Sequence, residues 1–259
     1  MSSNTHSFLH NMRVKKLYGL IGYPLGHSFS KKYFTEKFQR ENLPDFAYEN
    51  FPISSIGQLP AMLNDNPDLK GFNITIPYKE KIIACLDSCS ATVQTIGACN
   101  CVKIENGKLI GHNTDVPAFK QSIEKLLKPS HTKALVLGSG GAAKAVNHAL
   151  HLLQIKTLTV SRNSRTAGSI DYKEVNESVL KEYPVIVNTT PVGTFPNSDE
   201  CPAIPYQHLN SNHLLFDLVY NPSPSLFLQK GKEYGTAIKN GYEMLELQAD
   251  KSWEIWTAD

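Results

Sequence analysis

A glycine-rich turn between an apolar strand and a helix constrains the fold more than any other feature of the sequence. The apolar run 132–137 leads into GSGGAA (138–143), and a helical pattern follows. This order fits G-x-G-x-x-[G/A], whose glycines allow a tight turn and a close approach of a pyrophosphate to the helix N-terminus. A merely flexible turn is the alternative. The residues of the predicted dinucleotide site are Gly138, Ser139, Gly140, Gly141 and Ala142.

The end of the next strand bears on which dinucleotide is bound. The apolar run 157–160 ends about 20 residues after the glycines, where an NAD-binding chain usually has an acidic residue for the ribose 2′-hydroxyl. Here Arg162 and Arg165 stand at that place, without a carboxylate. Arginine forms bidentate, charge-assisted hydrogen bonds with phosphate. The sequence therefore favours NADP over NAD, with solvated surface arginines as the alternative.

Strand-like and helix-like segments alternate along the chain, which is typical of an α/β fold. The predicted strands cover residues 17–22, 47–53, 69–77, 99–104, 108–113, 132–137, 157–160, 184–190 and 213–220. The predicted helices cover residues 29–41, 78–86 with Pro77 at the first position, 116–127, the stretch after the glycine turn, and 242–256. A break at Lys128-Pro129-Ser130 precedes the strands of a doubly wound parallel sheet, which indicates a second domain.

Two short motifs predict local structure in the first part of the chain. Ser55 and Gln58 have the spacing of a capping box at the start of a short helix. The pair Asn106-Gly107 between two apolar runs predicts a tight β-hairpin.

Composition narrows the class of function. Lys and Arg number 26 against 24 Asp and Glu, a formal net charge of +2, which does not supply the basic surface that nucleic-acid binding needs. No apolar run approaches the ~18 residues of a membrane span, and the N-terminus lacks a signal-peptide pattern. The five cysteines are odd in number and have neither a C-x-x-C pair nor zinc-finger spacing. We therefore expect reduced thiols, no metal, a cytoplasmic location and small-molecule chemistry.

Two charged residues stand near the starts of predicted helices, and Lys79 is a candidate for proton transfer. Lys79 follows Pro77 in the predicted helix 78–86, where the positive end of the helix dipole disfavours a cation. Such a lysine could pass a proton to or from a hydroxyl during carbonyl reduction, and an ordinary surface lysine is the alternative. Asp115 precedes the predicted helix 116–127, so it could simply cap that helix.

Three further polar residues leave alternatives open. Ser28 and Ser30 bracket the start of the helix 29–41, where they could cap the helix or hold a carboxylate ligand. Gln248 lies beside the apolar stripe of the last helix. It is either a boundary glutamine or a side chain that reaches into a cleft.

Nine short motifs in one order resemble the shikimate dehydrogenase family over nearly the whole chain. They are GYPLGHSFS (22–30), GFNITIPYKE (71–80), GACNC (97–101), GHNTD (111–115), GSGGAA (138–143), SRN (161–163), NTTPVG (188–193), DLVYNP (217–222) and GYEMLELQA (241–249). The resemblance implies reversible, NADP-linked reduction of 3-dehydroshikimate to shikimate in aromatic amino acid biosynthesis, on the route to chorismate. It implies shikimate and 3-dehydroshikimate as the small-molecule partners.

The same resemblance implies a role for each matching residue. Lys79 and Asp115 would be the catalytic pair, in which Lys79 protonates the developing alkoxide and Asp115 orients Lys79 and binds the reacting hydroxyl. Ser28 and Ser30 would hold the substrate carboxylate. The residues implied to contact the ring hydroxyls or to frame the pocket are Asn73, Thr75, Asn100, Tyr220 and Gln248. Besides the glycine turn, the residues implied to contact the cofactor are Ser161, Arg162, Leu218 and Gly241.

The family also implies how the chain is divided. We expect an N-terminal tail at 1–13, an α/β substrate-binding domain at 14–115 and a Rossmann-type cofactor-binding domain at 116–240. The C-terminal helix, within 241–259, is expected to pack back on the substrate-binding domain. We expect a monomer or a homodimer that binds neither nucleic acid nor membrane. The alternatives are a quinate/shikimate dehydrogenase that uses NAD and a non-catalytic binding protein of the same fold.

Overall fold

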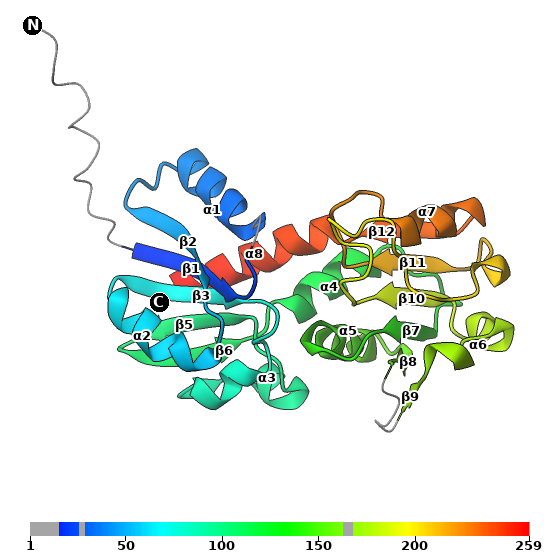
Figure 1. The fold of residues 1–259 in the computed structure, drawn as a ribbon, viewed down its shortest axis with the longest axis horizontal. Coiled ribbons are helices and arrows are strands. Elements are labelled where there is room, and N and C mark those ends of the chain that lie inside the picture. The colour runs from blue at the N-terminus through cyan, green and yellow to red at the C-terminus, as the bar shows by residue number, and fades with distance from the viewer. Residues whose placement is uncertain (1–15, 26–28, 163–167, 259) are drawn as a thin grey trace, which may run out of the picture. The chain divides into compact units, whose positions relative to one another are not determined.

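The chain forms two compact units in the computed structural model, which describes residues 16–25, 29–162 and 168–258. The first unit contains the described residues up to Val93, Cys99–His112 and the chain from Ser252 onward. The second unit contains Gln94–Ala98 and Asn113–Lys251. The predicted tail 1–13 lies outside the described residues. Each unit is built on one six-stranded sheet (Figure 1).

The first unit has a mixed sheet with the strand order β2-β1-β3-β5-β6-β4. Its strands are β1 (Lys16–Gly22), β2 (Phe46–Pro52), β3 (Leu69–Ile74), β4 (Ser88–Cys89), β5 (Cys101–Glu105) and β6 (Lys108–His112). Its helices are α1 (Phe29–Arg40), α2 (Leu59–Asp65) and the 3₁₀ helices η1 (Ile56–Gln58) and η2 (Lys81–Cys85), and the division between the units falls within α3 (Ala91–Ile96). Strand β1 is parallel to β2 and β3, and β5 is antiparallel to β3 and β6. Figure 1 shows α1 beside β1 and β2.

Aromatic side chains tie the last helix, α8 (Tyr242–Thr257), to the first unit. The ring of Trp256 lies 4.8 Å from that of Tyr18, and its indole Nε1 donates a hydrogen bond to the Val102 carbonyl at 2.9 Å. A Cβ atom at Gly71 would lie 2.4 Å from the same indole, so only glycine allows this contact. The end of the C-terminal helix, from Ser252, therefore packs within the first unit, whereas the start of this helix belongs to the second unit.

The second unit has a parallel sheet with the order β12-β11-β10-β7-β8-β9. Its strands are β7 (Lys133–Leu137), β8 (Lys156–Val160), β9 (Ser169–Ile170), β10 (Val185–Asn188), β11 (Leu214–Asp217) and β12 (Ala237–Asn240). Its helices are α4 (Asp115–Glu124), α5 (Gly141–Leu152), α6 (Glu177–Glu182), α7 (Leu226–Glu233), the start of α8, and the 3₁₀ helices η3 (Tyr172–Glu174) and η4 (Tyr206–His208). This order is that of a doubly wound sheet, as predicted. None of the described helices combines the length and apolar character needed to cross a membrane.

Strand β7 shows why the apolar run at 132–137 is continuous. Ala134 and Val136 belong to the hydrophobic cluster that includes residues of α5, whereas Leu135 and Leu137 belong to the cluster that includes residues of α7. Figure 1 shows α5 beside β7 and β8. A strand of a parallel sheet is covered on both faces, so neither face has room for polar side chains.

Both predicted local motifs are confirmed. The Ser55 hydroxyl accepts from the Gly57 N–H at 3.3 Å, and the Gln58 side chain accepts from the Ser55 N–H at 3.2 Å, so the two residues form a capping box on η1. Asn106 and Gly107 join β5 to β6 with φ values of 51° and 76°. Two successive positive φ values define the type I′ turn that suits the twist of a hairpin.

Gly107→Ala should lower the free energy of unfolding by about 1–2 kcal/mol, because an L-residue is strained at positive φ. A Cβ atom at this position would meet nothing within 4 Å, so backbone strain alone carries the effect. Urea denaturation measures the change. Gly57→Ala is the matched control, because Gly57 lies outside the left-handed region. An equal loss in both variants would contradict the turn assignment.

The prediction of an α-helix at residues 78–86 is wrong. Residues 79–80 form a turn, and only the short 3₁₀ helix η2 follows. In an α-helix the Lys79 carbonyl would accept from the Ile83 N–H, but it accepts from the Cys99 N–H at 2.8 Å, and the Ile83 N–H donates to Glu80. The hydrogen bond from Cys99, which is distant in sequence, therefore occupies the Lys79 carbonyl that an α-helix would use as an acceptor. Because Lys79 lies in a turn, no α-helix dipole acts on its ammonium group. The expected effect of such a dipole on this lysine is therefore wrong.

Candidate active site

Asn73 is the centre of a hydrogen-bonded group in the first unit. It is buried next to the end of β3, and its amide donates to the Asn100 carbonyl at 3.2 Å and to the Ser252 hydroxyl at 2.8 Å. The Tyr48 hydroxyl donates to Asn73 Oδ1 at 2.9 Å. Both amide hydrogens of Asn73 are thus engaged, and only a lone pair on Oδ1 is left for a ligand. These contacts favour a role in framing the pocket.

Ser30 joins the same group from the first turn of α1. Its side chain is buried and hydrogen-bonds with Tyr48. Burial raises the pKa of the Tyr48 hydroxyl well above its ordinary value, so this group stays protonated at neutral pH. Ser28 lies outside the described residues.

Sequence reasoning missed Tyr48 and Ser252. A hydroxyl within the buried stripe of the last helix was a signal for Ser252, because that position otherwise calls for an apolar side chain. Tyr48 gave no signal, since tyrosine is an ordinary strand residue.

The segment around Asn100 connects the end of β3 with Lys79. The buried Asn100 accepts at its carbonyl from the Ile74 N–H at 2.9 Å, and the preceding Cys99 N–H donates to the Lys79 carbonyl. Thr75 follows β3 and is half-buried, and a Cβ atom at Gly22 would lie 2.4 Å from its methyl group. Within the first unit the structure thus holds the backbones of Lys79, Asn100 and the end of β3 in one framework.

Asp115 is the first residue of α4 in the second unit and is buried. Asn113, two residues before the helix, accepts with its Oδ1 from the Val116 N–H of the first turn at 3.1 Å. Asp115 is therefore not the N-cap that the sequence suggested, because the helix begins at Asp115 itself and its N-cap is Thr114. A carboxylate in the first turn of a helix is stabilised by the helix dipole. Lys79 belongs to the first unit and Asp115 to the second.

The glycine turn lies at the carboxyl end of β7, where the strand order reverses between β7 and β10. Gly138 has a φ of +114°, and a Cβ atom there would lie 2.6 Å from the Thr189 hydroxyl. Gly140 stands at the N-cap of α5 and makes no side-chain cap. The backbone N–H groups of this helix end can therefore meet a pyrophosphate, and such reversal points are where doubly wound sheets bind dinucleotides. These residues fit NADP.

Ser161 and Arg162 follow β8. The buried Ser161 hydroxyl lies 3.2 Å from that of Ser139, which ties the end of β8 to the glycine turn. Arg162 is exposed. Burial raises the pKa of the Tyr172 hydroxyl, and the positive charge of Arg162 partly offsets this rise. The guanidinium is thus available at the place expected for a ribose 2′-phosphate. Arg165 lies outside the described residues.

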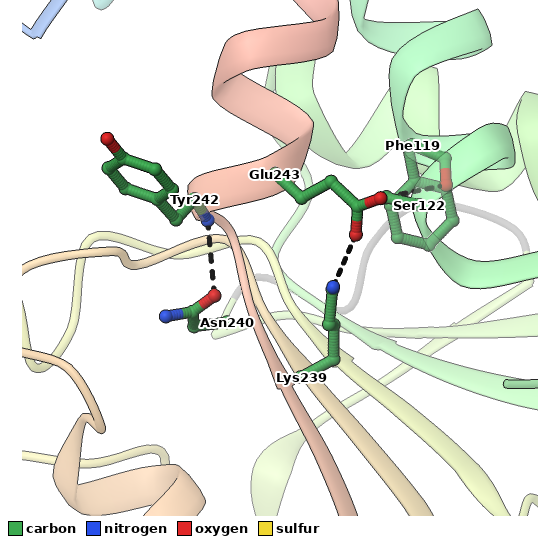
Figure 2. Close-up of polar contacts among 6 residues, drawn as sticks. All are labelled: Phe119, Ser122, Lys239, Asn240, Tyr242 and Glu243. Carbon is green, nitrogen blue, oxygen red and sulfur yellow. Dashed lines mark hydrogen bonds and ion pairs between the residues drawn. The ribbon is translucent and has the colours of Figure 1, made fainter.

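Leu218 and Gly241 are in direct contact. A Cβ atom at Gly241 would lie 2.4 Å from the Leu218 carbonyl oxygen, so a larger residue would push the two loops apart. Figure 2 shows the neighbours of Gly241 at the start of α8, where Asn240 Oδ1 accepts from the Tyr242 N–H at 3.4 Å. Tyr220, two residues after Leu218, is half-buried, and burial raises the pKa of its hydroxyl.

Gln248 lies on the buried face of α8. Met244, Gln248, Ser252 and Trp256 follow one another at intervals of one turn, and all four are buried. Gln248 is therefore not an exposed boundary residue, and its contact with a substrate stays a prediction.

Comparison with known proteins places this geometry in a family. A model described as the shikimate dehydrogenase substrate binding domain matches residues 20–102. An NADP(+) shikimate dehydrogenase of Methanococcus maripaludis is 37% identical, over 93% of this chain and 92% of that protein. The chain belongs to the shikimate dehydrogenase family.

Solved structures share the fold of this shikimate dehydrogenase family member. Shikimate 5-dehydrogenase of Thermus thermophilus, in complex with NADP(H) and shikimate, superimposes with a TM-score of 0.82 at 29% identity, over 93% of each chain. Quinate dehydrogenase of Corynebacterium glutamicum, in complex with NAD, has a TM-score of 0.83 at 25% identity, over 94% of each chain. The predicted family and the predicted α/β fold with a Rossmann-type sheet are confirmed.

Proposed function

We propose that this protein is an NADP-dependent shikimate dehydrogenase that reversibly reduces 3-dehydroshikimate to shikimate. The observation that carries the proposal is its 37% identity to an enzyme of that name over 93% of the chain. The glycine turn at the reversal point of the parallel sheet supports it independently. We assign substrate binding to residues 14–115 with 241–259, and cofactor binding to residues 116–240.

The second unit supplies the residues that hold the cofactor. The N–H groups around Gly140 and Gly141 would hold the pyrophosphate, and Ser161 and Arg162 would hold the 2′-phosphate. Leu218 and Gly241 would contact the nicotinamide. When bound, NADPH supplies the hydride that reduces the C3 carbonyl of the substrate.

The proton is handled by Lys79 and Asp115 in this proposal. Lys79 donates a proton to the oxygen at C3 as negative charge develops there, and Asp115 orients Lys79 and binds the same hydroxyl. Ser28 and Ser30 hold the substrate carboxylate in this proposal. The remaining residues that we assign to the ring hydroxyls or the pocket wall are Asn73, Thr75, Asn100, Tyr220 and Gln248.

An absorbance assay of nicotinamide reduction tests the function. Purified protein is given shikimate or quinate, each with NADP or NAD. Turnover with shikimate and NADP in preference to the other three combinations supports the proposal. Similar rates with quinate or NAD would favour a quinate/shikimate dehydrogenase, a candidate supported by the likeness to the NAD complex of quinate dehydrogenase. Binding without any turnover would indicate a non-catalytic member of the fold.

Arg162→Ala should raise KM for NADP about tenfold or more and leave KM for NAD nearly unchanged, because the lost bond is a charge-assisted one to the 2′-phosphate. Steady-state kinetics with both cofactors measure this. Lys173→Ala, which removes another exposed cation from the same unit, is the control. Equal effects on NADP and NAD would remove Arg162 from the 2′-phosphate site.

We further propose that the enzyme works in the cytoplasm as a monomer or homodimer. All five cysteines are thiols within the described structure, in keeping with a reducing compartment. Sedimentation velocity measures the oligomeric state, and a larger assembly would contradict this part of the proposal.

A further inference from the structure

Three neighbouring strands of the second unit end on polar residues in one row. Asn188 of β10, Asp217 of β11 and Asn240 of β12 are the last residues of their strands and are partners in register. Asn188 and Asp217 are completely buried. Polar side chains at this depth are retained only where they satisfy one another or neighbouring backbone groups.

Asp217 accepts three hydrogen bonds, one from the end of β10 and two from the segment that follows β11. Its Oδ1 accepts from Asn188 Nδ2 at 2.9 Å and from the Val219 N–H at 3.0 Å, and its Oδ2 accepts from the Ser225 hydroxyl. Ser225 is in turn the N-cap of α7. A carboxylate accepts hydrogen bonds on both oxygens, so Asp217 can accept from all three donors as they stand. An amide at this position would place an NH₂ group against one of these donors.

The segments that Asp217 holds are the loops after β10 and β11. Asn188 Oδ1 accepts from the Thr190 N–H at 3.0 Å, and the Phe195 N–H donates to the Asn221 carbonyl at 3.1 Å, so the two loops are also bonded to each other. The loop after β11 carries Leu218 and Tyr220. The path of this loop therefore depends on Asp217, the last residue of the strand that precedes it.

The charged form of Asp217 is costly in this place. Burial raises its pKa from 3.8 to about 6, although its three hydrogen bonds oppose the shift. Because the folded-state pKa lies above the unfolded one, the stability that this group contributes below pH 3.8 is lost as the pH rises to about 6. At neutral pH the carboxylate thus lowers stability, which is a common property of residues kept for function.

We propose that Asp217 is a positioning residue for cofactor use, whose carboxylate sets the path of the loop that presents Leu218 to the nicotinamide end of NADP. The inference rests on the proposed function, because it takes NADP as the ligand. In the proposed function the adenosine end would be held by Ser161 and Arg162 after β8, and β8 is on the other side of β7 from β11 in the strand order. Loss of the carboxylate should therefore affect one end of the cofactor and spare the other.

Asp217→Asn, which keeps the shape and removes the charge, tests this with two ligands. The dissociation constant for NADP should rise about tenfold, because the loop that carries Leu218 loses the charge-assisted hydrogen bonds that hold it. Binding of adenosine 2′,5′-bisphosphate, which has the 2′-phosphate but no nicotinamide, should change by less than about twofold, because distant sites act independently. Calorimetry measures both constants without turnover. Ser225→Ala removes one donor to Asp217 and should shift NADP binding in the same direction by a smaller factor.

Asn176→Ala is the matched control, because it removes the N-cap of α6 in the same unit and should leave both constants unchanged. Equal weakening of the two ligands by Asp217→Asn would overturn the inference, since it would reveal general loosening of the unit. Unchanged NADP binding in both Asp217→Asn and Ser225→Ala would overturn it as well. If the wild-type protein bound neither ligand, the proposed function would fall together with the inference.

Discussion

Lys79→Ala should lower kcat by about 100- to 10,000-fold, the range expected for removal of a general acid. Lys79 is half-buried in a turn of the first unit, and its carbonyl is held by the Cys99 N–H. The substitution leaves this backbone contact in place and removes only the side chain. Affinity for shikimate should change much less, because the proton is delivered in the transition state. Initial rates and equilibrium binding measure the two effects separately.

Lys79→Arg separates proton transfer from charge. The guanidinium remains positive but does not release its proton at neutral pH, so this variant should be nearly as slow as Lys79→Ala. Lys81→Ala is the control, because it removes an exposed lysine two residues after Lys79. It should retain the wild-type rate. Most of the wild-type kcat in Lys79→Arg would show that charge alone is needed, and an unchanged kcat in Lys79→Ala would remove Lys79 from the mechanism.

Under the proposed function, Asp115→Asn should lower kcat by about 100-fold or more, because an amide has no charge and accepts on only one of its two polar atoms. The side chain is buried in the first turn of α4, where Asn113 Oδ1 already accepts from the Val116 N–H. The loss of rate should therefore exceed what a weakened helix start explains. Steady-state kinetics, with circular dichroism to check folding, measure this change.

Glu177→Gln is the control for the helix-start effect. Glu177 is the first residue of α6, as Asp115 is of α4, so both substitutions remove a favourable charge from a first turn. Glu177→Gln should leave kcat unchanged. A wild-type rate for Asp115→Asn would show that the carboxylate serves the helix alone.

The sequence by itself determined the features that depend on neighbours in the chain. The capping box at Ser55, the hairpin turn at Asn106-Gly107 and the glycine turn at 138–143 each need only a few adjacent residues, so their motifs were sufficient. The parallel sheet followed from the alternation of apolar strands with helices. The order of nine motifs was sufficient for the family.

Only the tertiary structure decided the features that depend on distant partners. Lys79 lies in a turn because its carbonyl accepts a hydrogen bond from the N–H of Cys99, twenty positions along the chain. Helix propensity depends on neighbouring residues and does not predict that bond. Asn73 is engaged by Tyr48 and Ser252, which arrive from β2 and α8. The row of Asn188, Asp217 and Asn240 exists only because three strands are in register. Hydrogen bonds and strand register between separate segments are made when the chain packs, so local sequence patterns do not carry them.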